Sequence, residues 1–136
     1  YNLMEAVNMK RFFIISALLI FISSSLIYSQ DSIEVFSKLT DEDIELNLLE
    51  GVKSDNLGLK VSAAYFLGER KSQKSVIPLM KILREDKSPE ARIMAALSLF
   101  KIGDERGLFA VKQAIKFDDN DQVKKMCEIL TQMGRR

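Results

Sequence analysis

Two clusters of acidic residues are the clearest candidates for chemistry in this chain of 136 residues. Residues 41–43 read Asp-Glu-Asp, and residues 118–121 read Asp-Asp-Asn-Asp. Carboxylates at alternating positions can bind calcium, but an EF-hand loop also needs a central glycine and a final bidentate glutamate, which neither cluster has. Both clusters lie where a helix is predicted to begin, and acidic side chains there favour the positive end of the helix dipole. We therefore interpret both clusters as helix caps.

The groups that most often carry catalysis are nearly absent from the sequence. The chain has no histidine and a single cysteine, Cys127. Without imidazole, the commonest general base, the usual metal ligand and every histidine-dependent triad are missing. One cysteine cannot form an internal disulfide or a cysteine-based zinc site, and the sequence has no glycine-rich phosphate loop and no nucleophile elbow. We therefore expect no catalytic site, no cofactor and no metal.

Cys127 belongs to a sequence repeat that occurs in three copies. Residues 61–67 (VSAAYFL) align with residues 93–99 (IMAALSL) and, less closely, with residues 125–131 (KMCEILT). Cys127 falls where the two earlier copies have alanine, so we interpret its thiol as a small hydrophobic group in a tightly packed position. The offset between copies is constant, and a fixed period of roughly 20–50 residues is typical of stacked units that bury their apolar faces against one another.

Each unit of the repeat is predicted to be a pair of antiparallel helices, which makes the fold all-α. Ser88 before Pro89 is typical of an N-cap followed by proline at the first helical position. Gly68, Gly103 and Gly134 are predicted to end helices. The predicted helices cover about residues 31–39, 41–52, 57–67, 75–83, 89–102, 108–117 and 122–133.

A basic residue recurs once in each unit, as Lys60, Arg92 and Lys124. In the second and third units an aspartate precedes it by six residues, at Asp86 and Asp118. The first unit fits this pattern through Asp55 only if its turn is one residue shorter. The basic residues could line a groove for an acidic partner or could pair with the aspartates between units, and we favour pairing because ion pairs of this kind are partly buried.

The stretch from Val76 to Asp104, VIPLMKILREDKSPEARIMAALSLFKIGD, resembles a HEAT-like repeat of the kind also found in phycobilisome lyases. In such repeats a turn aspartate and a basic residue six positions later form a polar ladder between neighbouring units. The resemblance therefore implies ladder roles for four side chains, namely Asp86 with Arg92 and Asp118 with Lys124. It also implies a short α-solenoid of about three helical hairpins.

The N-terminal residues have the order of features found in secretory signals. Residues 9–11 (Met-Lys-Arg) precede an apolar run over residues 12–22, and small polar residues follow it. A short basic region, an apolar stretch and a small-residue cleavage site are typical of such a signal. We expect translation to start at Met9, or at Met4, with residues 1–8 upstream of the signal.

Cleavage of this signal is expected near Ser29 or Gln30. Residues 1–30 would then be removed, and residues 31–136 would form an exported HEAT-like domain in the periplasm or outside the cell. An uncleaved membrane anchor is the alternative, because the apolar segment over positions 12–28 is at the lower limit of length for crossing a hydrocarbon core of about 30 Å. The absence of a cysteine near the end of the apolar run excludes a lipoprotein.

The distribution of charge favours a protein over a nucleic acid as the partner. Residues 31–136 carry 18 basic and 18 acidic side chains, so they lack the basic excess that is usual in nucleic-acid-binding proteins. Residues 31–59 have a net charge of −6 and residues 60–136 one of +6, which could orient a partner or could only solvate helix surfaces. We expect a protein partner, no nucleic acid, and membrane contact only if the N-terminal segment stays uncleaved.

We expect the contact surface to include the exposed side of the second helices and the recurring basic residues. The candidates are Ser62, Ser98, Lys101, Arg92 and Lys124. Three functions remain in competition: a non-catalytic interaction or scaffold module, a lyase-like or other enzyme on a HEAT scaffold, and a membrane-anchored accessory subunit.

Overall fold

The computed structural model describes residues 40–134, and the N-terminal signal and the helix predicted over residues 31–39 lie outside this range. The described residues contain six α-helices and one short 3₁₀ helix, without any β-strand. Their bounds are α2 (Asp41–Gly51), α3 (Leu57–Glu69), η1 (Gln73–Ser75), α4 (Val76–Glu85), α5 (Pro89–Ile102), α6 (Glu105–Phe117) and α7 (Asp121–Met133). No helix in this range is long and apolar enough to cross a membrane.

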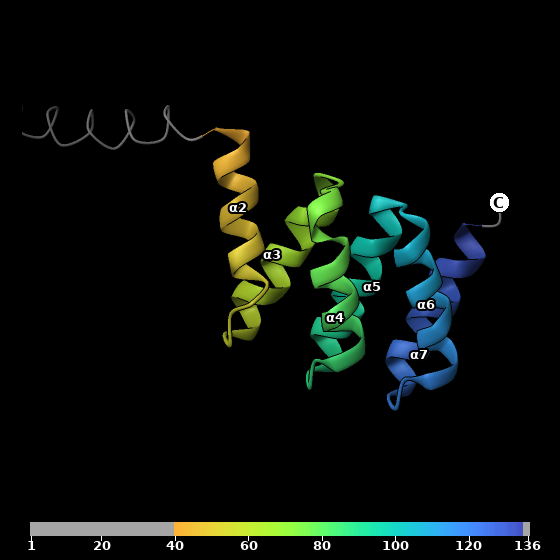
Figure 1. Cartoon of the computed structure of the whole chain (residues 1–136). Helices are drawn as coiled ribbons and strands as arrows, with labels where there is room; N and C mark the ends of the chain where they lie inside the picture. Colours follow the sequence, from red (N-terminus) through yellow and green to blue (C-terminus); the bar gives the residue numbers. More distant parts are fainter. Residues whose placement is uncertain (1–39, 135–136) are drawn as a thin grey trace, which may run out of the picture. The chain divides into compact units, whose positions relative to one another are not determined.

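The helices form two rows (Figure 1). Helices α2, α4 and α6 make the first row, and α3, α5 and α7 make the second row behind it. Each first-row helix packs on the second-row helix that follows it in the chain, while α5 contacts both α3 and α7. The arrangement confirms the prediction of an all-α fold and a short α-solenoid of three helical hairpins.

The core lies between the two rows and is lined by small side chains on the second row. Ala63 and Ala64 on α3, Ala95 and Ala96 on α5, and Cys127 on α7 are almost completely buried. Small residues at these positions allow neighbouring helices to approach closely. Larger buried side chains complete the core from both rows, namely Val52, Leu67, Val76, Leu79, Leu83, Leu99, Val111, Val123 and Leu130. The interpretation of Cys127 as a packed core residue is thus confirmed.

The first helix is also attached through its polar face. The carboxylate of Glu45 accepts a hydrogen bond from Ser72 Oγ at 2.6 Å and lies 3.0 Å from Lys74 Nζ. Arg70 Nη2 donates to Asp41 Oδ1 at 2.8 Å. The polar link between the first two hairpins therefore folds against α2 and includes the turn η1, which the sequence pattern does not predict.

The residue that caps the second helix recurs at the same repeat position in all three hairpins. The side chains of Asn56, Ser88 and Asn120 accept backbone N–H groups at the starts of α3, α5 and α7. Two residues before each cap, a side-chain oxygen accepts the backbone N–H of the capping residue itself. These oxygens belong to Ser54, Asp86 and Asp118, at distances of 3.1, 2.9 and 2.9 Å.

The expectation of a shorter turn in the first unit, with Asp55 as the counterpart of Asp86, is therefore wrong. Ser54 occupies that position, and no residue is missing. A serine hydroxyl makes the same hydrogen bond to the turn as an aspartate carboxylate does, but it carries no charge for a ladder. A search for aspartates alone misses this equivalence, because it selects the neighbouring Asp55 in place of Ser54.

One helix boundary differs from prediction. Gly68 lies inside α3, which continues to Glu69, and the left-handed residue after the helix is Lys71, with φ of 51°. The prediction that Gly68 ends the helix is wrong because this glycine serves close packing: a Cβ on it would lie 2.8 Å from the backbone of Ser98. Helix α6 begins at Glu105, ahead of its first apolar residue at position 108, and the acidic pair Asp104-Glu105 indicates this start in the sequence. Asp104 accepts the backbone N–H of Arg106 as the N-cap.

Substitution by alanine should have opposite effects at the two glycines of α3, Gly68 and Gly58. Gly68→Ala should destabilise the domain by up to about 2 kcal/mol, because overpacking against Ser98 costs about 1–3 kcal/mol and outweighs the gain in helix propensity of about 1 kcal/mol. Gly58→Ala should stabilise it by about 0.5–1 kcal/mol, since a Cβ there meets only the Asn56 side chain at 3.4 Å. Urea unfolding of both variants measures the difference, and equal effects would contradict the packing of α3 on α5.

Candidate functional site

The recurring charges form a ladder between hairpins. Lys60 Nζ on α3 lies 2.5 Å from Asp86 Oδ2 in the turn of the second hairpin. Arg92 Nη2 on α5 lies 3.0 Å from Asp118 Oδ1 and 2.6 Å from Asp119 Oδ1 in the turn of the third hairpin. The basic residue of one unit thus binds the aspartate of the next unit, 26 residues further along the chain.

Arg92 and Asp118 are among the most enclosed charges of the described domain. The Arg92 side chain is 9% exposed and the Asp118 side chain 5% exposed. Arg92 Nη1 also donates to the main-chain oxygen of Asp86 at 2.8 Å, so this side chain ties two successive turns together. Its Nε has no hydrogen-bond partner. The guanidinium is therefore bound by groups of neighbouring units, and too little of it is exposed to bind an external ligand.

The pKa of Asp86 shows the same balance of burial and pairing. Burial raises it, but hydrogen bonds from the Lys60 ammonium and the backbone N–H of Ser88, together with the positive charges of Lys60 and Arg92, lower it by more. The pKa of Asp86 is thereby lowered below its ordinary value of 3.8. The carboxylate is charged at neutral pH and holds its neighbours in the turn.

Lys124, the last basic residue of the series, is arranged differently. Its Nζ lies 3.7 Å from Asp121 Oδ1, on the preceding turn of its own helix, and it makes no ion pair with Asp118 among the described residues. No further hairpin follows α7 within that range to supply an aspartate. The pairing of Asp118 with Lys124 that the resemblance implied is replaced by the pairing of Asp118 with Arg92.

The predicted binding residues of the second row do not form a common surface. Ser98 is 1% exposed, and its Oγ donates to the main-chain oxygen of Ala64 at 2.7 Å, so the expectation that Ser98 is exposed is wrong. Lys101 forms an ion pair with Glu69, and its Nζ lies 4.9 Å from the ring centroid of Tyr65. Ser62 is exposed on α3. The polar groups of this face are thus mostly bound to one another.

The acidic clusters have structural roles. Asn120 caps α7 and Asp121 lies in its first turn, while Asp118 and Asp119 bind Arg92. Asp41 begins α2 and pairs with Arg70. Within residues 40–134 no three His, Cys, Asp or Glu side chains are grouped as a metal site requires.

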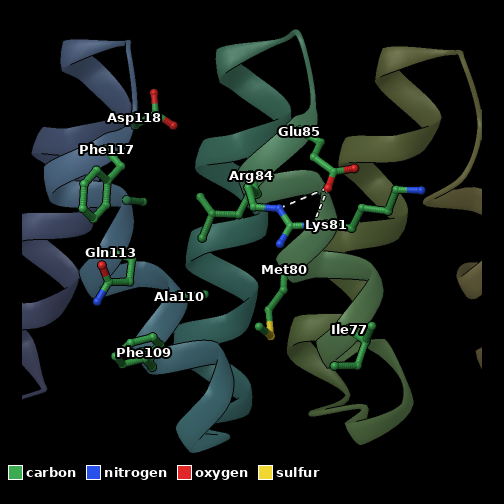
Figure 2. Close-up of a pocket in the computed structure, with 12 residues that line it drawn as sticks. Ile77, Met80, Lys81, Arg84, Glu85, Phe109, Ala110, Gln113, Phe117 and Asp118 are labelled. Carbon is green, nitrogen blue, oxygen red and sulfur yellow. Dashed lines mark hydrogen bonds and ion pairs between the residues drawn. The ribbon is translucent and has the colours of Figure 1, made fainter.

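A groove lies between the first-row helices α4 and α6 of the described domain (Figure 2). Its volume is about 890 Å³, within the range of ligand-binding clefts. Three apolar side chains that line it are unusually exposed: Ile77 is 57% exposed, Phe109 60% and Phe117 79%. Met80, Ala110 and Ala114 line it more deeply. Contiguous exposed apolar surface of this kind commonly marks an interaction site.

The repeat itself places the groove residues. Ile77, Lys81 and Glu85 are spaced by four residues along the outer face of α4, and Phe109, Gln113 and Phe117 stand at the equivalent positions of α6, one repeat later. The inner face of each helix supplies the core instead. Sequence reasoning missed the groove because it gave Phe109 and Phe117 no role. The available signal was the position of Phe109 and Phe117, which are out of register with the core residues Val111 and Ile115.

The charge on the first row changes sign along the chain. Helix α2 carries five acidic residues and no basic residue, whereas α4 and α6 together carry five basic and two acidic residues. Lys81, on the groove wall, has no ion pair in the described part of the chain, and Arg84 contacts only its neighbour Glu85. Asp118 also borders the groove, but its carboxylate is bound by Arg92.

A comparison with protein families supports the same architecture. The family model for HEAT repeats matches residues 45–130, which is more than half of the chain. The chain belongs to the HEAT-repeat family. HEAT repeats commonly mediate contacts between proteins, and stacked helical repeats provide the extended surfaces for such contacts. The narrower resemblance of this HEAT-repeat protein to the repeats of phycobilisome lyases stays a prediction. A comparison with curated proteins finds no match.

Removal of the buried basic group should be costly. Arg92→Met leaves Asp118 enclosed without its partner, so we expect a loss of about 3–5 kcal/mol in the free energy of unfolding. Lys124→Met, the equivalent change at the open end of the ladder, should cost only about 0–1 kcal/mol. Urea unfolding of both variants compares them, and a similar cost for the two would refute the ladder.

The lowered pKa of Asp86 predicts a specific pH dependence. Its ionised form stabilises the folded state above pH about 4, and this contribution disappears as pH falls through the folded-state pKa. Asp86→Asn should therefore be less stable than the natural protein at pH 7, and the difference should shrink below pH 4. Asp55→Asn, at an exposed residue without an ion pair in the described range, is the control with a flat difference. Unfolding midpoints measured from pH 7 to pH 2.5 make the comparison.

Proposed function

We propose that this HEAT-repeat protein is a non-catalytic interaction module that acts outside the cytoplasm and holds a protein partner in the groove between α4 and α6. The observation that carries the proposal is the exposure of two phenylalanines, Phe109 and Phe117, that line a hollow of about 890 Å³. Burial of such side chains against a partner is favourable in proportion to the apolar area removed from water.

The chemistry of the described residues supports a role without catalysis. Burial raises the pKa of the Cys127 thiol to about 11, with a smaller contribution from Asp118, so this thiol is protonated at neutral pH and hardly nucleophilic. Asp86, Glu90 and Asp104 have lowered pKa values, and their carboxylates are engaged in hydrogen bonds that cap helices or join hairpins. A lyase-like or other enzyme would need a reactive group in the groove, whose charged lining consists of Lys81, Arg84, Glu85 and Asp118.

The sequence of the N-terminal segment supports a location outside the cytoplasm. A basic start followed by an apolar run is typical of export, and the balanced charge of residues 31–136 favours a protein over a nucleic acid as the partner. A membrane-anchored accessory subunit is the second candidate, favoured by the length of the apolar segment over positions 12–28. N-terminal sequencing of the protein recovered from cells separates the two, since a start near Gln30 or Asp31 removes the anchor.

Photo-crosslinking in the cells that produce the protein tests the proposed function. A photoreactive phenylalanine analogue at position 117 or 109 should give the same discrete crosslinked protein, because both side chains border the groove. The analogue at position 66, an exposed phenylalanine on α3, should not give it. Crosslinks of equal yield at all three positions, or none from the groove, would contradict the proposal.

A further inference from the structure

We infer that the groove between α4 and α6 binds an amphipathic α-helix of the partner protein, with an apolar stripe flanked by acidic residues. The inference rests on the proposed function and names the chemistry of the partner. It is drawn from the shape of the groove, the position of its apolar side chains and the charge around it.

The shape of the groove suits a helix. Helices α4 and α6 run side by side in the same direction (Figure 1), so the hollow between them is elongated along their axes. They contain 10 and 13 residues, which corresponds to about 15–20 Å of helix at 1.5 Å per residue. A partner helix of three to four turns would fill this length, and its side chains would enter the space between the two helices, as in other helix-in-groove complexes.

The apolar side chains are spaced for a helical ligand. Phe109 and Phe117 lie eight residues apart, which is slightly more than two turns, and Gln113 lies between them on the same face of α6. Figure 2 shows that Ile77 and Met80 come from α4, across from this face. A partner helix with apolar residues at every third or fourth position could contact both walls along its length.

The basic side chains around the groove favour a partner helix with acidic residues beside its apolar stripe. Lys81 lines the α4 wall with its ammonium directed away from α6 (Figure 2). It makes no ion pair in the described residues, although its charge helps to lower the pKa of Glu85, and the Arg84 side chain is 77% exposed. An acidic flank would pair with these groups, whereas a basic flank would be repelled. The acidic helix α2 at the other end of the first row repels an acidic partner and so confines it to the groove.

A second copy of the chain is a weaker candidate for the occupant. Helix α2 is the acidic helix that another copy could offer, but of its apolar residues only Ile44 and Leu46 are exposed, while Leu48 and Leu49, with Val52 directly after the helix, already pack in the core of their own domain. Presenting them to another molecule would require α2 to leave α3. A separate protein with a free amphipathic helix avoids this cost.

Two designed peptides test the inference. Both are 18-residue helices with the same leucine stripe and a fluorescein label, and they differ only in flanks of glutamate or of lysine. The full chain is held in phosphatidylcholine nanodiscs, so that the apolar segment over positions 12–28 stays soluble and the lipid adds no net charge. Fluorescence anisotropy should show at least tenfold tighter binding of the glutamate peptide, with a preference that decreases as salt rises.

Substitutions should locate the binding in the groove. Phe109→Gln and Phe117→Gln should each weaken the glutamate peptide at least fivefold, while Phe66→Gln, at a similarly exposed phenylalanine on α3, should not. Lys81→Glu should weaken the glutamate peptide and strengthen the lysine peptide. Lys125→Glu, at an exposed lysine on α7 without an ion pair in the described range, is the matched charge control. The five residues are exposed, so the melting temperatures of the variants should stay close to that of the natural protein.

Four outcomes would overturn the inference: equal affinity for the two peptides, equal loss in the groove and control variants, no binding of either peptide, or self-association in sedimentation that Phe117→Gln abolishes. If neither peptide binds but the crosslinks at positions 109 and 117 still form, the groove holds a protein of another kind and the proposed function stands. If the crosslinks also fail, both proposals fall.

Discussion

The close approach of the second-row helices is the constraint on which the rest of the domain depends. Gly68 of α3 leaves room for the backbone of Ser98 on α5, and Ser98 Oγ donates to the Ala64 main-chain oxygen across the same contact. Alanines line the neighbouring turns of both helices. This contact fixes the separation of the first two hairpins, and with it the position at which the turn aspartates meet the basic residues.

The buried ladder then sets the register of one hairpin against the next. An ion pair such as Arg92 with Asp118 gains little net stability over an apolar pair of the same size, because both charges lose water on burial. Its effect is selective instead: a hairpin shifted by one turn would leave two charges enclosed and unpaired. The apolar core determines that the hairpins stack, and the ladder determines how they stack. The first-row helices α4 and α6 are thereby placed beside each other with the groove between them.

The sequence predicts the architecture well because the pattern of a helical hairpin occurs in it three times. The constant period, the cap at Ser88 and the left-handed end at Gly103 are all signals in the sequence itself, and the structure confirms each. Pairing partners are harder to predict, because the aspartate six residues before Arg92 is near in sequence while its actual partner, Asp118, lies in the next unit. In the sequence, a glycine that ends a helix looks the same as a glycine that makes room for a neighbouring helix. The role of Gly68 depends on its distance from Ser98 on α5, which no local sequence pattern contains.

The candidate site was less predictable than the fold. Ser98 is polar and lies on a second-row helix, which suggested an exposed surface, yet its hydroxyl is satisfied inside the contact with α3. Phe109 and Phe117 lie in the helix predicted over residues 108–117, but their outward position was not predicted. In both cases the direction in which the side chain faces depends on the helical register, which residue type alone does not give.

The polarity of the ladder has a consequence for how such a protein can change in length. The first unit offers a basic group but has the uncharged Ser54 in the turn, and the third unit offers an aspartate but leaves Lys124 without an acceptor in a following turn of the described chain. Within the described chain, the middle unit has both its aspartate and its basic group paired with neighbouring units, through Asp86 and Arg92. A tandem duplication of residues 72–103 would therefore give every internal basic group an aspartate to meet. A copy of the first unit would instead place the uncharged Ser54 opposite a basic group, so the ladder favours growth of the array from its middle unit over growth from its first.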